Sequence, residues 1–168
     1  ESRSRKFSGM RGTLVAAICI IMSLVHLYTA GFGVFEAIKQ RNIHLTFVLV
    51  LSFLLYPSRK TDAGTKTSWL DWILVGLSIY VGVYLMLIYD DLANRGGVTV
   101  PMDIYMGGLL CLLVLEAARR ATGKELPIMA LLFIAYAMFG DYIPGQFGHR
   151  GYSLERLIDH MYLTTEGI

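Results

Sequence analysis

Two long stretches without a charged side chain constrain this chain more than any other feature. Residues 12–35 form a run of 24 without Asp, Glu, Lys or Arg, and residues 72–89 form a second run of 18. A hydrocarbon core about 30 Å thick requires roughly 20 helical residues to cross it. Charged residues make up only 17% of the chain, below the level of about 25% in soluble domains. The sequence therefore predicts an all-α integral membrane protein, a bundle of transmembrane helices.

Five transmembrane helices are expected from the apolar segments, over residues 13–30, 43–56, 69–88, 100–118 and 126–142. The second is the shortest, because residues 42–58 provide 17 uncharged positions, or about 25 Å of helix. It crosses a bilayer only if the flanking Arg41 and Arg59 extend their charged ends to the interface. Trp69 and Trp72, at the start of the third segment, suit the headgroup region.

The distribution of Lys and Arg tests whether the second segment crosses. With five spans, ten of these residues share a side with the N-terminus and five lie opposite; without that crossing the division is seven against eight. Basic loops collect on the cytoplasmic side, so we expect five spans, a cytoplasmic N-terminus and an external C-terminal tail. The cytoplasmic group is Arg3, Arg5, Lys6, Arg11, Arg59, Lys60, Lys66, Arg119, Arg120 and Lys124; the external group is Lys39, Arg41, Arg95, Arg150 and Arg156.

The tail differs in character from the rest of the chain. Leu154, Leu157, Ile158 and Met161 follow helical spacing, which predicts an amphipathic helix over 152–163 that is too short and too charged to span. It lies either on the outer membrane surface or a partner domain, or it packs back on the bundle. The expected organisation is a cytoplasmic segment (1–12), a four-helix domain (13–118), a connector with the fifth helix (119–145) and an external segment (146–168).

Pairs of small residues mark expected helix contacts. Gly107 with Cys111, and Ser78 with Gly82, have the small-xxx-small spacing that lets helix backbones approach closely in a membrane. We expect packing from these four residues and nothing more specific. Cys19 and Cys111 lie inside different spans with no CxxC or Cys/His cluster, so both are expected to be buried and free. No metal-ligand spacing is present.

Five polar residues in or near the spans are candidates for a functional or an ion-pair role. Asp103 and Glu116 are carboxylates close to predicted span ends, where such groups are costly and often functional. A snorkelling geometry or a local arginine partner, Arg119 or Arg120 for Glu116, explains them structurally. His26 lies deep in the first span. It is either a packing group that hydrogen-bonds a neighbouring helix or a proton carrier, and we expect the packing role.

Two adjacent aspartates lie outside the predicted spans. Asp90 and Asp91, near Arg95, fall in a predicted external loop. They are either solvated there or dock an external protein.

Several function classes are disfavoured by what the sequence lacks. It contains no phosphate-binding GxxxxGK[ST] loop, no nucleophile motif and no HExxH, so we expect neither an enzyme nor a resident cofactor. The basic residues form no single patch, and no nucleic-acid partner is expected. The spans have no mid-helix Gly/Pro interruptions of the kind that build transporter ion sites, so this chain by itself is expected to be a scaffold.

The last third of the chain resembles the fused permeases of TRAP transporters. Residues 116–127 are similar to the family's connection between its fourth and fifth helices, and residues 162–168 to the start of its large domain. The similar motifs are EAARRATG at 116–123, LP at 126–127, YAMFG at 136–140, PG at 144–145, HRG at 149–151 and YLTTEGI at 162–168. Residues 1–115 agree with the family in hydropathy layout more than in motif.

This resemblance implies a secondary transporter of the bacterial or archaeal cytoplasmic membrane. It implies uptake of organic acids such as dicarboxylates with an extracytoplasmic solute-binding protein, often of the TAXI type, and a cation gradient, commonly Na⁺. The family's substrate and Na⁺ sites lie in a large domain that would follow residue 168, and no substrate ligand carries over to this chain. Because the chain starts at Glu1 and stops directly after a helical stretch, we expect it to be part of a longer polypeptide.

Two other function classes compete with this interpretation. A non-transport membrane anchor or assembly factor would use the tail as a docking helix. A membrane-embedded enzyme would need a convergent set of His, Asp or Glu, which the sequence does not suggest.

Overall fold

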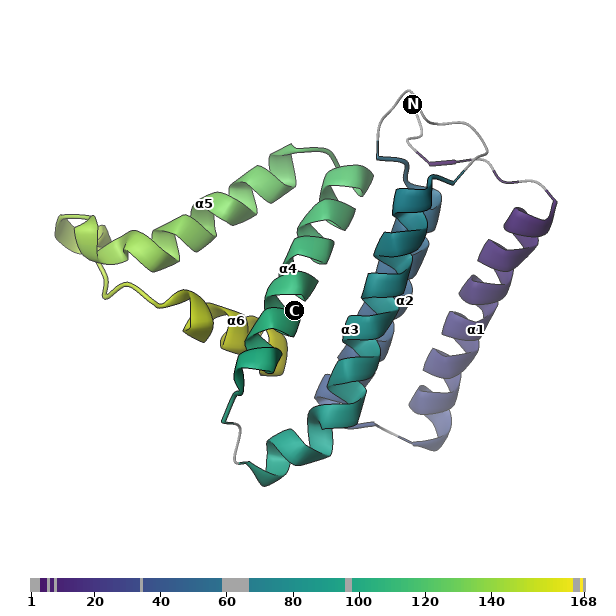
Figure 1. Ribbon diagram of the computed structural model, residues 1–168, viewed down its shortest axis with the longest axis horizontal. Coiled ribbons are helices and arrows are strands. Elements are labelled where there is room, and N and C mark those ends of the chain that lie inside the picture. Colours follow the sequence, from purple (N-terminus) through teal and green to yellow (C-terminus); the bar gives the residue numbers. More distant parts are fainter. Residues whose placement is uncertain are drawn as a thin grey trace.

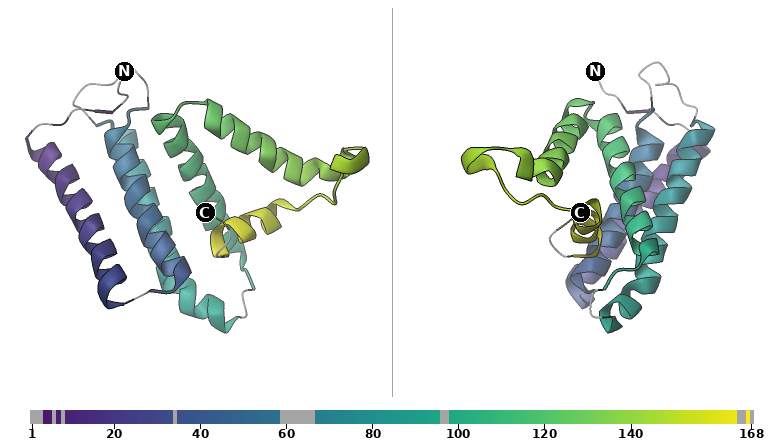
Figure 2. Two further views of the ribbon diagram at one scale, coloured as in Figure 1. Left: turned by 180° about the vertical axis from the view of Figure 1, so that it is seen from behind. Right: turned by 60° about the vertical axis from the view of Figure 1, so that its left-hand side comes forward.

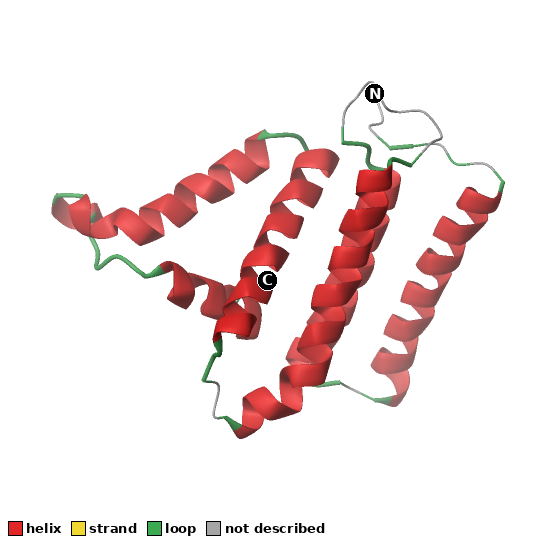
Figure 3. Cartoon of the chain, viewed as in Figure 1, coloured by secondary structure: helices red, strands yellow, loops and turns green. Residues whose placement is uncertain are grey.

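The computed structural model describes residues 4–5, 7, 9–33, 35–58, 67–95, 98–164 and 167. Within these ranges every regular element is helical (Figures 1 and 3). The helices are α1 (Met10–Phe32), α2 (Ala37–Leu55), α3 (Trp69–Asn94), α4 (Pro101–Ala121), α5 (Glu125–Phe139) and α6 (Leu154–Leu163), with 3₁₀ turns η2 (Gly140–Tyr142) and η3 (Gly145–Phe147). Arg3, Lys6, Arg59, Lys60 and Lys66 from the charge comparison, and most of the terminal motif after 164, lie outside the described residues.

Five of these helices are long and apolar enough to cross a membrane. The expected fold class, an all-α membrane bundle, is thereby confirmed, and the chain is a multi-pass membrane protein. The candidate spans are Met10–Phe32, Ala37–Leu55, Trp69–Leu92, Pro101–Ala121 and Glu125–Tyr142.

The packed core lies where α2, α3 and α4 meet. Leu49 and Phe53 of α2 and Val81 of α3 are almost fully buried, and Leu110 and Leu113 of α4 complete the contact. Figure 1 shows α2 and α3 running side by side, with α4 next to them. Helix α2 ends at Leu55 because Pro57 disfavours helical backbone in the residue before it.

Helices α1 and α5 lie at the edges of this core. Thr29 is the buried residue of α1, and Pro127 that of α5. Figures 1 and 2 show α5 diverging from α4, so that its far end stands away from the bundle. Large apolar side chains such as Leu27 and Phe133 point outwards, as expected for surfaces that contact lipid.

Two helices extend beyond their predicted limits at the same end of the bundle. Helix α2 already begins at Ala37, and α3 continues to Asn94. Asp90 and Asp91 therefore lie on the last turns of α3, and their expected position in a loop is wrong. Both carboxylates are exposed but paired, Asp90 with Lys39 at 3.1 Å and Asp91 with Arg95 at 3.0 Å.

Helix α6 packs back on the bundle rather than extending away from it (Figure 2). Tyr162 and Leu163 are buried, and the side chains of Ile158 and Tyr162 lie directly over Gly107 of α4. Ser153 caps the helix by accepting a hydrogen bond from the Arg156 amide at 3.3 Å. The sequence allowed this segment to lie on the membrane surface or a partner domain, or to pack back on the bundle. These contacts correspond to packing on the bundle.

Candidate functional site

Three buried charged side chains, Arg5, Asp71 and Arg120, meet at one end of the bundle, where α2 ends, α3 begins and α4 ends. Asp71, in the first turn of α3, has a fully buried side chain. One carboxylate oxygen accepts from Arg5 Nη2 at 2.7 Å, and the other accepts from Arg120 Nη1 at 2.6 Å. We call Arg5, Asp71, Glu116, Arg119 and Arg120 the arginine cluster.

The cluster also caps the C-terminus of α2. Arg5 Nη1 donates to the Leu54 carbonyl at 3.0 Å, and the Arg5 amide donates to the Leu55 carbonyl at 2.8 Å. Arg120 Nη1 lies 3.3 Å from the Tyr56 carbonyl. The last carbonyls of a helix lack intrahelical partners and carry a partial negative charge, so positive side chains stabilise them. Asp71 complements the N-terminus of α3 in the same way and accepts from the Ser68 amide at 3.0 Å.

Glu116 has the local partners that helical spacing suggests. It accepts from Arg119 Nε and from Arg120 Nε, both at 2.7 Å. Arg119 also reaches the carbonyl of Ser58 at 3.3 Å. Arg120 is the junction of the cluster, because it joins Glu116 on its own helix to Asp71 on α3. The cluster thus contains three guanidinium groups and two carboxylates, a net charge of one positive unit. This positive charge lies near the carbonyl groups at the end of α2.

The opposite end of the bundle holds a second buried carboxylate. Asp103, which is 1% exposed, accepts from Tyr84 Oη at 2.6 Å and from its own helix start, the Val100 amide, at 3.0 Å. Arg95 Nη1 lies 3.4 Å away. Asp103 therefore does not snorkel to solvent; it ties α4 to α3 and to the turn between them.

Tyr162 of α6 contributes to the same region. Burial, reinforced by the neighbouring Tyr84 and Asp103, raises the pKa of its phenol. The phenol remains a neutral donor and reaches the Val81 carbonyl of α3 at 3.4 Å. Helix α6 is thus attached to α3 as well as to α4.

A polar seam joins α1 to α2. His26 bonds the Met22 carbonyl through Nδ1 at 2.6 Å, and its Nε2 lies 3.0 Å from Nδ1 of His44. The two imidazoles meet edge to face with their centroids 5.0 Å apart. Gln40 donates to Thr29 at 2.9 Å one turn further along. His26 therefore contacts α2 through a hydrogen bond to His44.

The small residues singled out in the sequence lie at different contacts. Gly82 faces α2, where a Cβ would overlap Thr46 Oγ1, and its carbonyl accepts from Asn42 at 2.8 Å. Ser78 is buried, and its hydroxyl donates a hydrogen bond to the Leu74 carbonyl at 2.7 Å. Gly107 allows α6 to approach α4: a Cβ there would lie 2.6 Å from Ile158 Cγ2.

The cysteines differ from one another. Both are free thiols; Cys111 is partly buried, whereas Cys19 is exposed. The expectation that Cys19 is buried is wrong, because α1 contributes little to the core and turns this position outwards.

These arrangements connect helices to one another. The part of the chain described contains no group of three His, Cys, Asp or Glu side chains that could hold a metal. One hollow lined by Asn42, Leu85, Leu110 and Tyr162 has a volume of about 10 Å³, which is room for a single water molecule. Each buried carboxylate is already bonded to guanidinium, hydroxyl or amide donors, so the clusters act as cross-links.

Sequence reasoning missed Arg5 and Asp71 of the arginine cluster, and Tyr84 as the partner of Asp103. Arg5 and Asp71 are 66 positions apart, and no local pattern joins them. The available signal was the spacing from Ser68 to Asp71, a helix-start pattern directly before an apolar run. Tyr84 carried no signal, because it looks like an ordinary residue of an apolar span. Asn42 lies just before the predicted second span, and no local pattern points to its partner, the Gly82 carbonyl.

Comparison with protein-family models, with curated proteins and with solved structures finds no match to this chain. Its architecture and contacts define a multi-pass α-helical membrane protein in which ion clusters clamp both ends of a three-helix core.

Proposed function

We propose that this chain is the small-subunit-like scaffold region of a TRAP-type secondary transporter permease. The proposal starts from the resemblance of residues 116–168, which the five apolar helices accommodate. The expected connector falls on α5, and the motif EAARRATG falls on the end of α4 and the turn after it.

The observation that carries a scaffold role is that both carboxylates of the arginine cluster are bonded to arginine side chains. Asp71 and Arg120 are buried side by side, and their hydrogen bonds join α3 and α4 to the C-terminus of α2 and to the N-terminal segment. A side chain that binds and releases a solute or an ion must exchange partners during transport. Breaking a buried pair of this kind is strongly unfavourable, so the cluster suits a part that stays rigid while another part moves.

The solute and the coupling ion follow from the resemblance alone. Organic acids, dicarboxylates among them, would enter with Na⁺ down its gradient, delivered by an extracytoplasmic solute-binding protein. The binding groups would belong to a large domain later in the same polypeptide. The part described here would hold that domain in the membrane.

The test is uptake by the full-length polypeptide in proteoliposomes, supplied with the solute-binding protein and radiolabelled dicarboxylates. We expect uptake that requires both the binding protein and an inward Na⁺ gradient, and none from residues 1–168 alone. Co-expressing residues 1–168 with the remaining polypeptide as a separate chain should restore it.

The reading frame beyond residue 168 gives an independent test. A continuation into many further apolar segments supports the proposal. A stop codon or a soluble domain there would contradict it and would favour a membrane anchor or assembly factor instead.

A further inference from the structure

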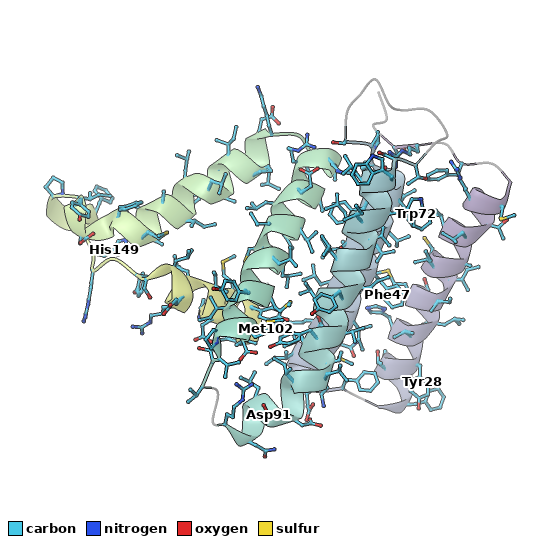
Figure 4. All side chains as sticks on the ribbon, viewed as in Figure 1. Tyr28, Phe47, Trp72, Asp91, Met102 and His149 are labelled. Atoms are coloured by element: carbon cyan, nitrogen blue, oxygen red, sulfur yellow. The ribbon has the colours of Figure 1, made fainter. Side chains whose placement is uncertain are left out.

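The segment at the end of α5 folds into a compact turn that carries exposed aromatic side chains. The turn spans residues 139–152 and contains η2 and η3. Phe139, Tyr142, Phe147 and Tyr152 are all exposed, Tyr142 and Phe147 by 80% and 75%. Figure 4 shows His149 at this remote end of α5, far from the core. We call residues 139–152 the aromatic turn.

Its backbone is held by hydrogen bonds to itself and to α5. The His149 amide donates to the Gly140 carbonyl at 3.0 Å, and the Tyr152 amide donates to the Ala137 carbonyl at 3.0 Å. The Tyr136 hydroxyl donates to the Phe147 carbonyl at 2.7 Å. The turn is therefore a fixed extension of the helix.

Close packing inside the turn requires glycine. A Cβ at Gly140 would overlap the imidazole of His149, and one at Gly148 would overlap the carbonyl oxygen of Ile143. The imidazole lies between two tyrosine rings, at centroid distances of 4.8 Å from Tyr136 and 5.9 Å from Tyr152. The interior is thus filled by small residues and one histidine, whereas large aromatic rings point outwards.

A lipid interface explains why the large aromatic rings point outwards and the small residues lie inside. The span Glu125–Tyr142 has 18 residues, or about 27 Å of helix, close to the hydrocarbon thickness of about 30 Å. With Lys124 and Glu125 at one boundary, Tyr142 falls at the other. Tyrosine is enriched at membrane–water boundaries because its ring suits the acyl region and its hydroxyl suits water.

The surroundings of the turn favour lipid over a protein partner. The apolar surface of α5 is exposed along its length, at Leu132, Phe133 and Phe139, and the aromatic turn follows it with the exposed rings of Tyr142 and Phe147. Asp141, Gln146 and Arg150 are exposed on the same turn and provide the polar side that faces headgroups and water.

We infer that the aromatic turn is a preformed anchor that inserts Tyr142 and Phe147 into the headgroup–acyl boundary of the bilayer and so fixes the end of α5. The inference rests on the membrane fold and not on the proposed transport function.

The experiment measures the depth of a single tryptophan. Trp69 and Trp72, the two tryptophans of the chain, are replaced by Phe, and Phe147→Trp is introduced. The protein is reconstituted in phosphatidylcholine bilayers with bromine placed near the glycerol end or near the methyl end of the acyl chain. Phe133→Trp, in the middle of α5, is the matched control.

We expect blue-shifted Phe147→Trp emission, quenched more by bromine near the glycerol end, and the opposite preference for Phe133→Trp. Quenching of Phe147→Trp by aqueous iodide without quenching by bromine would overturn the inference by placing the turn in water. Protection from both quenchers would also overturn it, because a protein surface would then cover the turn.

A second variant tests whether the turn is preformed. Adding Gly148→Ala should move Phe147→Trp towards water, with a red shift and weaker bromine quenching. Gly76→Ala, at a position where a Cβ has open space, should leave the spectrum unchanged. An unchanged depth in Gly148→Ala would refute the preformed geometry.

Discussion

Replacing Asp71 by asparagine tests the arginine cluster at its fully buried carboxylate. Asp71→Asn keeps the shape of the side chain but removes the negative charge between Arg5 and Arg120, whose nitrogens lie 2.7 and 2.6 Å from its oxygens. All three side chains are at most 2% exposed, so water does not replace the lost partner. The new amide group also directs N–H towards one guanidinium, donor against donor.

We expect the substitution to lower the free energy of unfolding by about 3–5 kcal/mol, the cost of leaving one member of a buried ion pair without its partner. The measurement is reversible unfolding in mixed micelles, followed by circular dichroism. The matched control is Asp91→Asn, which removes an i,i+4 pair with Arg95 from an exposed carboxylate and should cost about 0.5 kcal/mol or less.

A double-mutant cycle separates the charge effect from a general loss of packing. Arg5→Met removes the uncompensated cation that Asp71→Asn creates, so the double variant should be less destabilised than the sum of the two single changes. The expected coupling is about 0.5–3 kcal/mol. Two results would contradict this reasoning: a free energy of unfolding for Asp71→Asn within about 1 kcal/mol of the native value, or additive effects of the two substitutions. Either would show that the arginine cluster does not hold the helices together.

The remaining predictions address packing and topology. Gly82→Ala should destabilise the bundle by about 1–3 kcal/mol through overpacking against α2, whereas Gly76→Ala should be neutral or slightly stabilising in the same unfolding assay, since alanine is the better helix former. Gly107→Leu should displace α6 and increase its cleavage by added protease; an unchanged cleavage rate would show that this contact is dispensable. Cysteine labelling in a background without native cysteines should reach position Lys124 only from the cytoplasmic side and Arg95 only from outside, and labelling of both from one side would contradict the five-span topology.

Much of the fold could be predicted because it depends on local quantities. The length of an uncharged run decides whether a helix can span, and this placed all five membrane helices in their observed order. The predicted first and last residues of the helices were less accurate. Helix α3 passes through Asp90 and Asp91 to Asn94, because Lys39 and Arg95 pair with these carboxylates and lower the cost of keeping them helical.

The candidate site was predicted only where partners share a helix. Glu116 lies three and four residues before Arg119 and Arg120, and side chains at those spacings meet on a helix surface. The partners of Asp103 were not evident, because Tyr84 belongs to another span. The arginine cluster was missed for the same reason, although three of its members, Glu116, Arg119 and Arg120, had been singled out.

The sequence by itself determined that this chain is a membrane protein and how many helices can span the bilayer. Both properties follow from the free energy of transferring each apolar side chain into lipid. It also determined the amphipathic character of the tail. Only the tertiary structure decided that Arg5 closes over Asp71, that Asn42 bonds the carbonyl of Gly82, and that α6 lies on Gly107. Each of these contacts joins residues from separate segments, and the choice among many possible polar partners depends on how the helices pack.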